Sequence, residues 1–110
     1  MSVHRHLWYY IREIDGTIRV STDPLEFGEF YQNPDSRRLR RTQVGDADVS
    51  TVFLGFDHRL IGAGEPILFE TMIFGGDHDC YQERYETEAQ AVAGHRRIVE
   101  WLTGQSEQGA

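Results

Sequence analysis

The side chains that could carry chemistry in this chain are carboxylates and histidines at the ends of apolar runs. Asp57 and His58 follow the run VFLGF, and Asp77, His78 and Asp79 follow the run PILFETMIFGG. Carboxylates and imidazoles are the common acid–base groups and metal ligands of proteins. Their spacing here matches no metal-binding motif such as HExxH or paired CxxC sequences. We therefore expect no metal and no cofactor, and we expect these residues to close hairpins.

Glu70 differs from these residues because it interrupts the apolar sequence LFETM. An unpaired buried carboxylate costs several kcal/mol or takes up a proton, so Glu70 needs a partner. One account is a cross-strand ion pair with Arg40, Arg41 or Arg84. The other account is contact with a ligand or a substrate. The residues expected to contact a ligand or partner are Glu70, Asp57, His58, Arg40 and Arg84.

The remaining motifs favour structural roles. The loop HRLIGAGEP has a GxG spacing, but it joins two strands and opens no helix, so the mechanism of a phosphate-binding loop is missing. Cys80 is the single cysteine, and a lone thiol in a strand is usually a packing residue. The arginines of SRRLRR and the aromatic residues Trp8, Tyr9 and Tyr10 could contact nucleic acid, but a net charge of -7 argues against it.

The composition is that of one acidic, soluble domain. The chain has 110 residues, of which 39% are hydrophobic and 26% charged, and this suffices for a single core. One cysteine allows no internal disulfide, so the cytoplasm is the expected compartment. No segment approaches the roughly 18 apolar residues of a membrane span. We expect one domain over residues 1–103 and a disordered tail over 104–110, because GQSEQGA has nothing apolar to bury.

The first third of the chain predicts a hairpin and a helix. Strand-forming residues on both sides of Asp15-Gly16, in LWYYIREI and TIRVS, indicate a tight hairpin. Asp23 before Pro24 offers an N-cap and a first helical residue, which predicts a helix from Pro24 to about Gln32. Asn33-Pro34 ends it.

The rest of the chain predicts four strands and a final helix. A second hairpin joins the strands 39–44 and 49–56 around Gly45-Asp46, and its VFLGF segment is apolar on both faces, as in a central strand. PILFETMIFGG supplies a further buried strand, and CYQERYE a more exposed one. Thr87 to Gln90 matches a capping box, and an apolar stripe that includes His95 continues to Leu102.

The element order is thus β-β-α-β-β-β-β-α, with connections too short for parallel crossovers. We predict an α+β fold with a mostly antiparallel sheet of about six strands and two helices packed on one face. The other face of the sheet stays open, and an open face is where binding would most naturally occur.

Three strings also resemble a known family: VSTVFLGFDH, PILFETMIFGG and ERYETEAQAVAGHRRIVE. The chain resembles, over about residues 7–102, small uncharacterised proteins of tailed bacteriophages, prophages and bacterial genomes. The family carries no assigned chemistry, so the resemblance implies a phage or prophage origin and no activity.

Two functions of different classes follow. The first is a non-enzymatic, phage-type accessory protein that binds a host protein or a small ligand through its sheet face and loops. The second is a small metal-dependent or acid–base hydrolase that uses Asp57, His58 and Glu70. Convergence of these three residues around a concave pocket would favour the enzyme, and engagement of each with other partners would favour the binding protein. The oligomeric state stays open.

Overall fold

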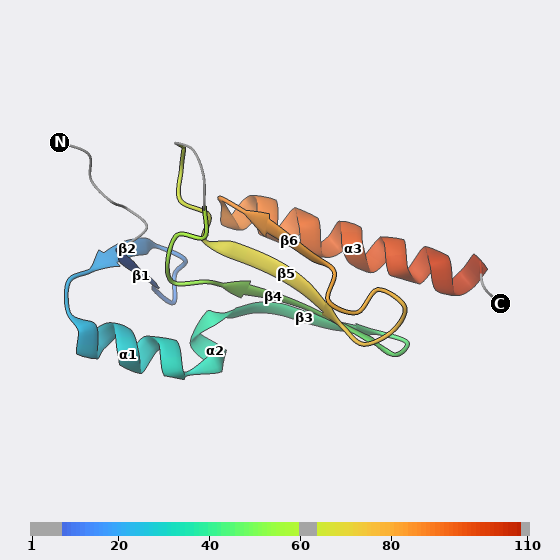
Figure 1. Cartoon of the computed structure of the whole chain (residues 1–110), viewed down its shortest axis with the longest axis horizontal. Helices are drawn as coiled ribbons and strands as arrows, with labels where there is room; N and C mark the ends of the chain where they lie inside the picture. The colour runs from blue at the N-terminus through green and yellow to red at the C-terminus, as the bar shows by residue number, and fades with distance from the viewer. Residues whose placement is uncertain (1–7, 60–63, 109–110) are drawn as a thin grey trace.

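The computed structural model describes residues 8–59 and 64–108, and it has the predicted α+β fold with antiparallel sheets (Figure 1). The strands are β1 (Tyr9–Arg12), β2 (Ile18–Ser21), β3 (Arg38–Val44), β4 (Ala47–Phe53), β5 (Phe69–Phe74) and β6 (Gln82–Tyr85). The helices are α1 (Pro24–Gln32), α2 (Pro34–Arg37) and α3 (Glu88–Gln108). The six strands divide into two sheets, a β1-β2 hairpin and a four-stranded sheet of order β3-β4-β5-β6.

The hairpin β1-β2 forms where the sequence predicts it, but its loop is longer than a two-residue turn. The N–H of Glu13 donates to the carbonyl of Thr17 at 2.8 Å, so residues 14–16 form the loop. Of the described loop residues only Gly16 has a positive φ, at 92°. The tight turn expected at Asp15-Gly16 is therefore not formed. Asp15 does not adopt the left-handed conformation that a two-residue turn needs from both residues.

Helix α1 begins and ends at the predicted residues. The Asp23 side chain accepts a hydrogen bond from the N–H of Leu25 at 3.0 Å, and the helix ends before Asn33. Asn33 then caps the short helix α2 through a bond from the N–H of Asp35 at 3.1 Å. The sequence analysis missed α2, a single turn of helix that leads directly into β3.

The four-stranded sheet has one buried and one uncovered face. Residues of β4 alternate strictly, with every second side chain buried from Ala47 to Phe53. The register places Thr51 opposite Thr71 of β5 and Phe53 opposite Phe69. The prediction that this strand is central is confirmed, because β4 lies between β3 and β5, but the strand ends at Phe53 and not at residue 56.

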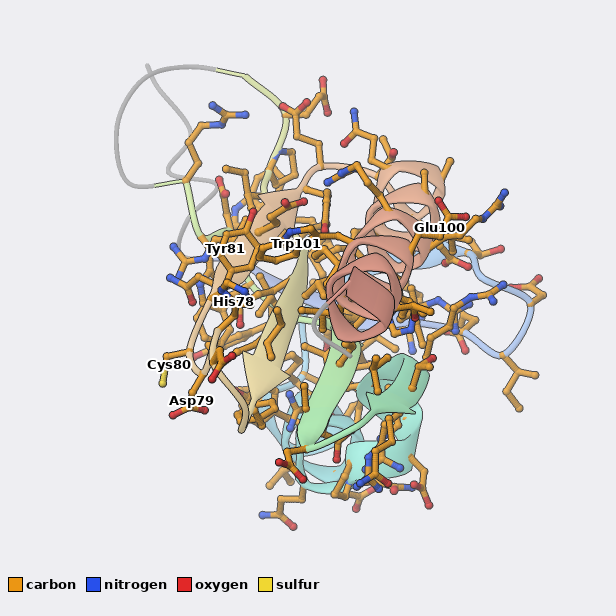
Figure 2. All side chains as sticks on the ribbon, turned by 90° about the vertical axis from the view of Figure 1, so that its right-hand side faces the viewer. His78, Asp79, Cys80, Tyr81, Glu100 and Trp101 are labelled. Carbon is orange, nitrogen blue, oxygen red and sulfur yellow. The ribbon has the colours of Figure 1, made fainter. Side chains whose placement is uncertain are left out.

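Helix α3 covers the buried face (Figure 2). Its start is the predicted capping box, because the N–H of Gln90 donates to Thr87 Oγ1 at 3.1 Å and the N–H of Thr87 donates to Gln90 Oε1 at 3.2 Å. The helix extends past Leu102 to Gln108, into the segment 104–110 for which disorder was expected. No helix among the described residues is both long and apolar enough to cross a membrane.

Two apolar clusters hold the layers together. Tyr10, Phe53, Leu68, Phe69 and Ala91 join the hairpin to the sheet and to α3. Ala47, Val49, Ile73, Ile98 and Leu102 form the second cluster, under the later turns of α3. Helix α1 packs on the hairpin and reaches the first cluster through Phe30, whose ring lies edge-on to Phe53 at 5.9 Å. Both longer helices thus contact the side of the sheet that Phe53 faces.

Candidate functional site

The uncovered face of the four-stranded sheet is the surface that the sequence analysis selected for binding. Strand alternation and register assign its side chains, which are Arg38, Arg41, Gln43, Asp48, Ser50, Val52, Glu70, Met72, Phe74, Gln82 and Arg84. Its apolar members are Val52, Met72 and Phe74, and Phe74 is 51% exposed. Two cross-strand ion pairs, Arg41 with Asp48 and Arg84 with Glu70, flank them.

Glu70 has the cross-strand arginine that its position in an apolar strand required. Arg84 lies directly opposite on β6 and donates from Nε to Glu70 Oε2 at 2.9 Å. The Glu70 side chain is only 13% exposed and that of Arg84 is 34% exposed. The pair thus satisfies a largely shielded carboxylate on the uncovered face.

Asp57 fastens the two ends of the loop between β4 and β5. Its Oδ1 accepts hydrogen bonds from the N–H groups of Arg59 and Ile67, both at 2.8 Å. The N–H of His58 adds a bond to the carbonyl of Ile67 at 2.9 Å. The Asp57 carboxylate therefore has a local structural role, as the hairpin-end prediction implied.

His58 lies close enough to the ion pair of Glu70 and Arg84 for both charges to influence its pKa. Burial lowers the pKa of His58, the positive charge of Arg84 lowers it further, and the carboxylates of Glu70 and Asp57 act in the opposite direction. Its ring stacks on Phe56 at 4.7 Å, and its buried Nε2 has no hydrogen-bond partner among residues 8–59 and 64–108. The three residues of the hydrolase hypothesis are neighbours, but the two carboxylates bond to other groups.

Arg40 lies on the opposite side of the sheet from Glu70. It lines a groove of about 360 Å³ between β3 and α3, together with Thr42, Val92, His95, Arg96, Val99 and Glu100. Within the described part of the chain, no group of three or more carboxylate, histidine or cysteine side chains is placed to hold a metal ion. The predicted contact residues thus separate: Glu70, Arg84 and His58 share one region, and Arg40 belongs to another.

A buried chain of hydrogen bonds crosses the interface between α3 and the sheet. His95 is 4% exposed; its Nε2 lies 2.9 Å from Thr42 Oγ1 on β3, and its Nδ1 lies 2.7 Å from Thr51 Oγ1 on β4. Thr51 Oγ1 in turn lies 2.5 Å from Thr71 Oγ1 on β5. The sequence analysis assigned His95 to an apolar stripe and missed this network. The sequence signal for the network is one inward-facing threonine in each apolar strand, Thr51 in β4 and Thr71 in β5. Their pairing can be recognised only once the register is known.

The chain continues to a carboxylate on β6. Thr71 hydrogen-bonds to Tyr85, whose Oη donates to Glu83 Oε1 at 3.0 Å. Burial is the main reason that the pKa of Tyr85 is raised to about 12. The Glu83 carboxylate also accepts from Tyr81 and Arg97.

An ionised Glu83 carboxylate at the end of the chain is consistent with one direction of its bonds. An ionised carboxylate only accepts, so Tyr85 donates to Glu83, Thr71 donates to Tyr85, and Thr51 donates to Thr71. In this direction Thr51 would accept from a proton on His95 Nδ1, and Thr42 would donate to His95 Nε2. Burial, and next the positive charge of Arg40, lower the pKa of His95, so the ring is neutral at neutral pH.

The segment from Asp77 to Tyr81 closes the β5-β6 turn, at the opposite end of β5 from Asp57. Asp79 Oδ1 accepts from the N–H of Gly75 at 2.7 Å. The rings of His78 and Tyr81 contact Trp101 of α3 at 4.4 and 5.5 Å (Figure 2). Cys80 is exposed, and the charge of Asp79 raises the pKa of its thiol, which makes the thiol a poorer nucleophile.

No protein-family model, no curated protein and no solved structure matches this chain. Its function has to be inferred from its side chains and their contacts.

Proposed function

We propose that this chain is a non-enzymatic accessory protein that binds a protein partner through the uncovered face of its four-stranded sheet. The observation that carries the proposal is the group of Val52, Met72 and Phe74 on neighbouring strands, with ion pairs beside it. An apolar centre with a polar rim is the usual composition of a protein–protein contact surface. The half-exposed Phe74 supplies the kind of aromatic side chain that such surfaces favour.

The shape of this face favours a protein over a small ligand. A pleated sheet surface is broad and shallow, whereas small-molecule sites are concave. Among the described residues, grooves of about 280, 360 and 600 Å³ border α3, and none of these is lined by a residue of the uncovered face. The resemblance to phage and prophage proteins makes a bacterial host protein the expected partner.

Bond geometry gives the hydrolase alternative no support. A general base needs a free lone pair within reach of a substrate. Asp57 Oδ1 holds two backbone N–H groups and Glu70 Oε2 holds Arg84, so one oxygen of each carboxylate is engaged in a structural contact. His58 bonds to neither carboxylate among the described contacts, so a base with its orienting partner is missing.

The proposal is tested by placing a positive charge in the centre of the face. Phe74→Arg and Met72→Arg should each abolish capture of a partner from bacterial lysate. The captured protein is identified by mass spectrometry, and its affinity is then measured with both proteins purified. Ile14→Arg is the matched control, because Ile14 is fully exposed in the hairpin loop, away from this face. Binding that survives both face variants, or that Ile14→Arg abolishes equally, would refute the assignment.

Glu70→Gln separates binding from structure at the ion pair. The substitution keeps the shape of the side chain and removes its charge. If the partner contacts Glu70, affinity falls and the protein stays folded. If the ion pair is only structural, affinity is unchanged and stability falls by up to about 1 kcal/mol, as is usual for a partly exposed pair.

A further inference from the structure

The groove between β3 and α3 holds the two described arginines whose side chains have neither an ion pair nor a hydrogen bond to another described residue. Arg40 and Arg96 both line it, and neither forms an ion pair or hydrogen bond with another residue of 8–59 or 64–108. The other described arginines form ion pairs, except Arg37, which donates to the carbonyl of Tyr31 and lies over its ring. They are Arg12, Arg19, Arg37, Arg38, Arg41, Arg59, Arg84 and Arg97.

This distribution does not arise from a shortage of acidic side chains. The chain has 18 aspartates and glutamates against 11 basic residues. Glu100 even lines the same groove, yet it forms no ion pair with Arg40 or Arg96. Figure 2 shows Glu100 on the side of α3 away from Tyr81 and Trp101. Two arginines and one glutamate give the lining of the groove a net positive charge, which favours an anion.

The walls and floor of the groove suit a small molecule. Val92 and Val99 of α3 are its apolar members, and Thr42 and His95 add polar atoms. Its volume of about 360 Å³ falls at the lower end of ligand-binding clefts, which range over about 300–1,000 Å³. Thr42 Oγ1 already bonds to His95 Nε2, so the two guanidinium groups are the charged donors of the groove.

We propose that this groove binds the oxyanion group of a small molecule, a phosphate or a carboxylate, between Arg40 and Arg96. A guanidinium group presents paired N–H donors whose geometry matches both kinds of oxyanion. The apolar side chains of Val92 and Val99 would contact the carbon skeleton of the ligand. This site lies across the sheet from the proposed protein-binding face, so each can fail without the other.

Calorimetric titration with inorganic phosphate and with acetate, in a chloride buffer, tests the site. Saturable binding is expected, and Arg40→Gln and Arg96→Gln should each weaken it at least tenfold. The matched controls remove the same charge from adjacent positions: Arg41→Gln on the opposite face of β3 and Arg97→Gln, whose side chain pairs with Glu83. Both controls should bind like the parent protein.

The two anions distinguish the ligand classes. Tighter binding of phosphate would identify a phosphate-bearing ligand, and tighter binding of acetate a carboxylic acid. The absence of saturable binding of either anion to the parent protein would overturn the proposal. Equal weakening in Arg40→Gln and Arg41→Gln would also overturn it, because it would show attraction by total charge. Circular dichroism checks that the variants fold, as expected for residues without structural partners.

Discussion

Gly94 of α3 lies against the ring of Tyr85 on β6, so closely that a Cβ on Gly94 would sit 2.5 Å from Tyr85 Cζ. Glycine is unfavourable inside a helix, yet here it allows α3 to approach the sheet at the partly buried Tyr85. The same approach brings His95, the next residue, to the threonines of β3 and β4.

Gly94→Ala should therefore destabilise the protein by about 1–3 kcal/mol through overpacking, although alanine is the better helix former. Gly104→Ala is the matched control in the same helix, because nothing lies within 4 Å of its added methyl group. It should raise the free energy of unfolding by up to about 1 kcal/mol. Urea denaturation measures both. A Gly94→Ala protein as stable as Gly104→Ala would show that α3 can move away from β6 without cost.

Stability should fall as the pH drops below about 6.5, the pKa of an unperturbed histidine. The pKa values of His95 and His58 are lowered in the folded protein, mainly by burial. The unfolded chain therefore binds protons first, and each histidine contributes a slope of at most about 1.4 kcal/mol per pH unit between 6.5 and its folded pKa. Above pH 7 neither contributes a slope.

His95→Gln and His58→Gln test this pH dependence. Each variant should flatten the plot of unfolding free energy against pH between 6.5 and 5.5, whatever its stability at neutral pH. The carboxylates whose pKa is lowered, such as Asp48 and Glu88, lose their contribution only at lower pH. A slope unchanged in the double variant would mean that both imidazoles accept a proton without cost.

The direction of the buried hydrogen bonds predicts the tautomer of His95. Imidazole nitrogen chemical shifts should show the proton on Nδ1 and an unprotonated Nε2 that accepts from Thr42. Thr51→Val would leave that N–H without an acceptor and should cost about 1–3 kcal/mol. Thr51→Ser keeps the hydroxyl and should cost only about 0.8 kcal/mol, for the lost methyl group. A proton found on Nε2 would contradict the assigned direction.

Replacing Cys80 with glycine should stabilise the folded protein. Its φ is 72°, and it pairs with Ile73 together with Tyr81, so that two residues oppose one in a β-bulge. The first position of such a bulge normally holds glycine. Relief of about 1–2 kcal/mol of strain, less about 0.5–1 kcal/mol of chain entropy, should leave Cys80→Gly slightly stabilised. Cys80→Ala keeps a Cβ and should bring no gain in the thermal unfolding temperature.

Local signals predicted the local structure. The Asp23 cap and the capping box at Thr87 depend on residues within one turn of helix, and both are present. The division into two sheets depends on contacts between distant segments. Tyr9 pairs with Phe56 only through a single bridge, so the hairpin β1-β2 does not join the larger sheet of β3 to β6. Nothing in either segment alone indicates this break.

The candidate sites show the same limit. The position of Glu70 in an apolar strand was enough to predict a partner, but only the register selects Arg84 from the three arginines considered. Arg40 and Arg41 were grouped because they are neighbours in sequence. Adjacent strand residues point to opposite faces, so one lines the groove at α3 and the other pairs with Asp48. The hydrogen bonds of His95 were not predicted, because its partners Thr42 and Thr51 lie on two strands that are distant from it in the sequence.

The ion pair of Arg12 with Glu88 joins residues 76 positions apart, and Tyr10 and Ala91 share a buried cluster across a similar distance. During synthesis, therefore, the N-terminal hairpin emerges long before the helix against which it is fastened. The apolar side of β3 to β6 stays uncovered until α3 leaves the ribosome, and a nascent chain depends on α3 to become compact. Early termination within α3 would leave that surface exposed to aggregation.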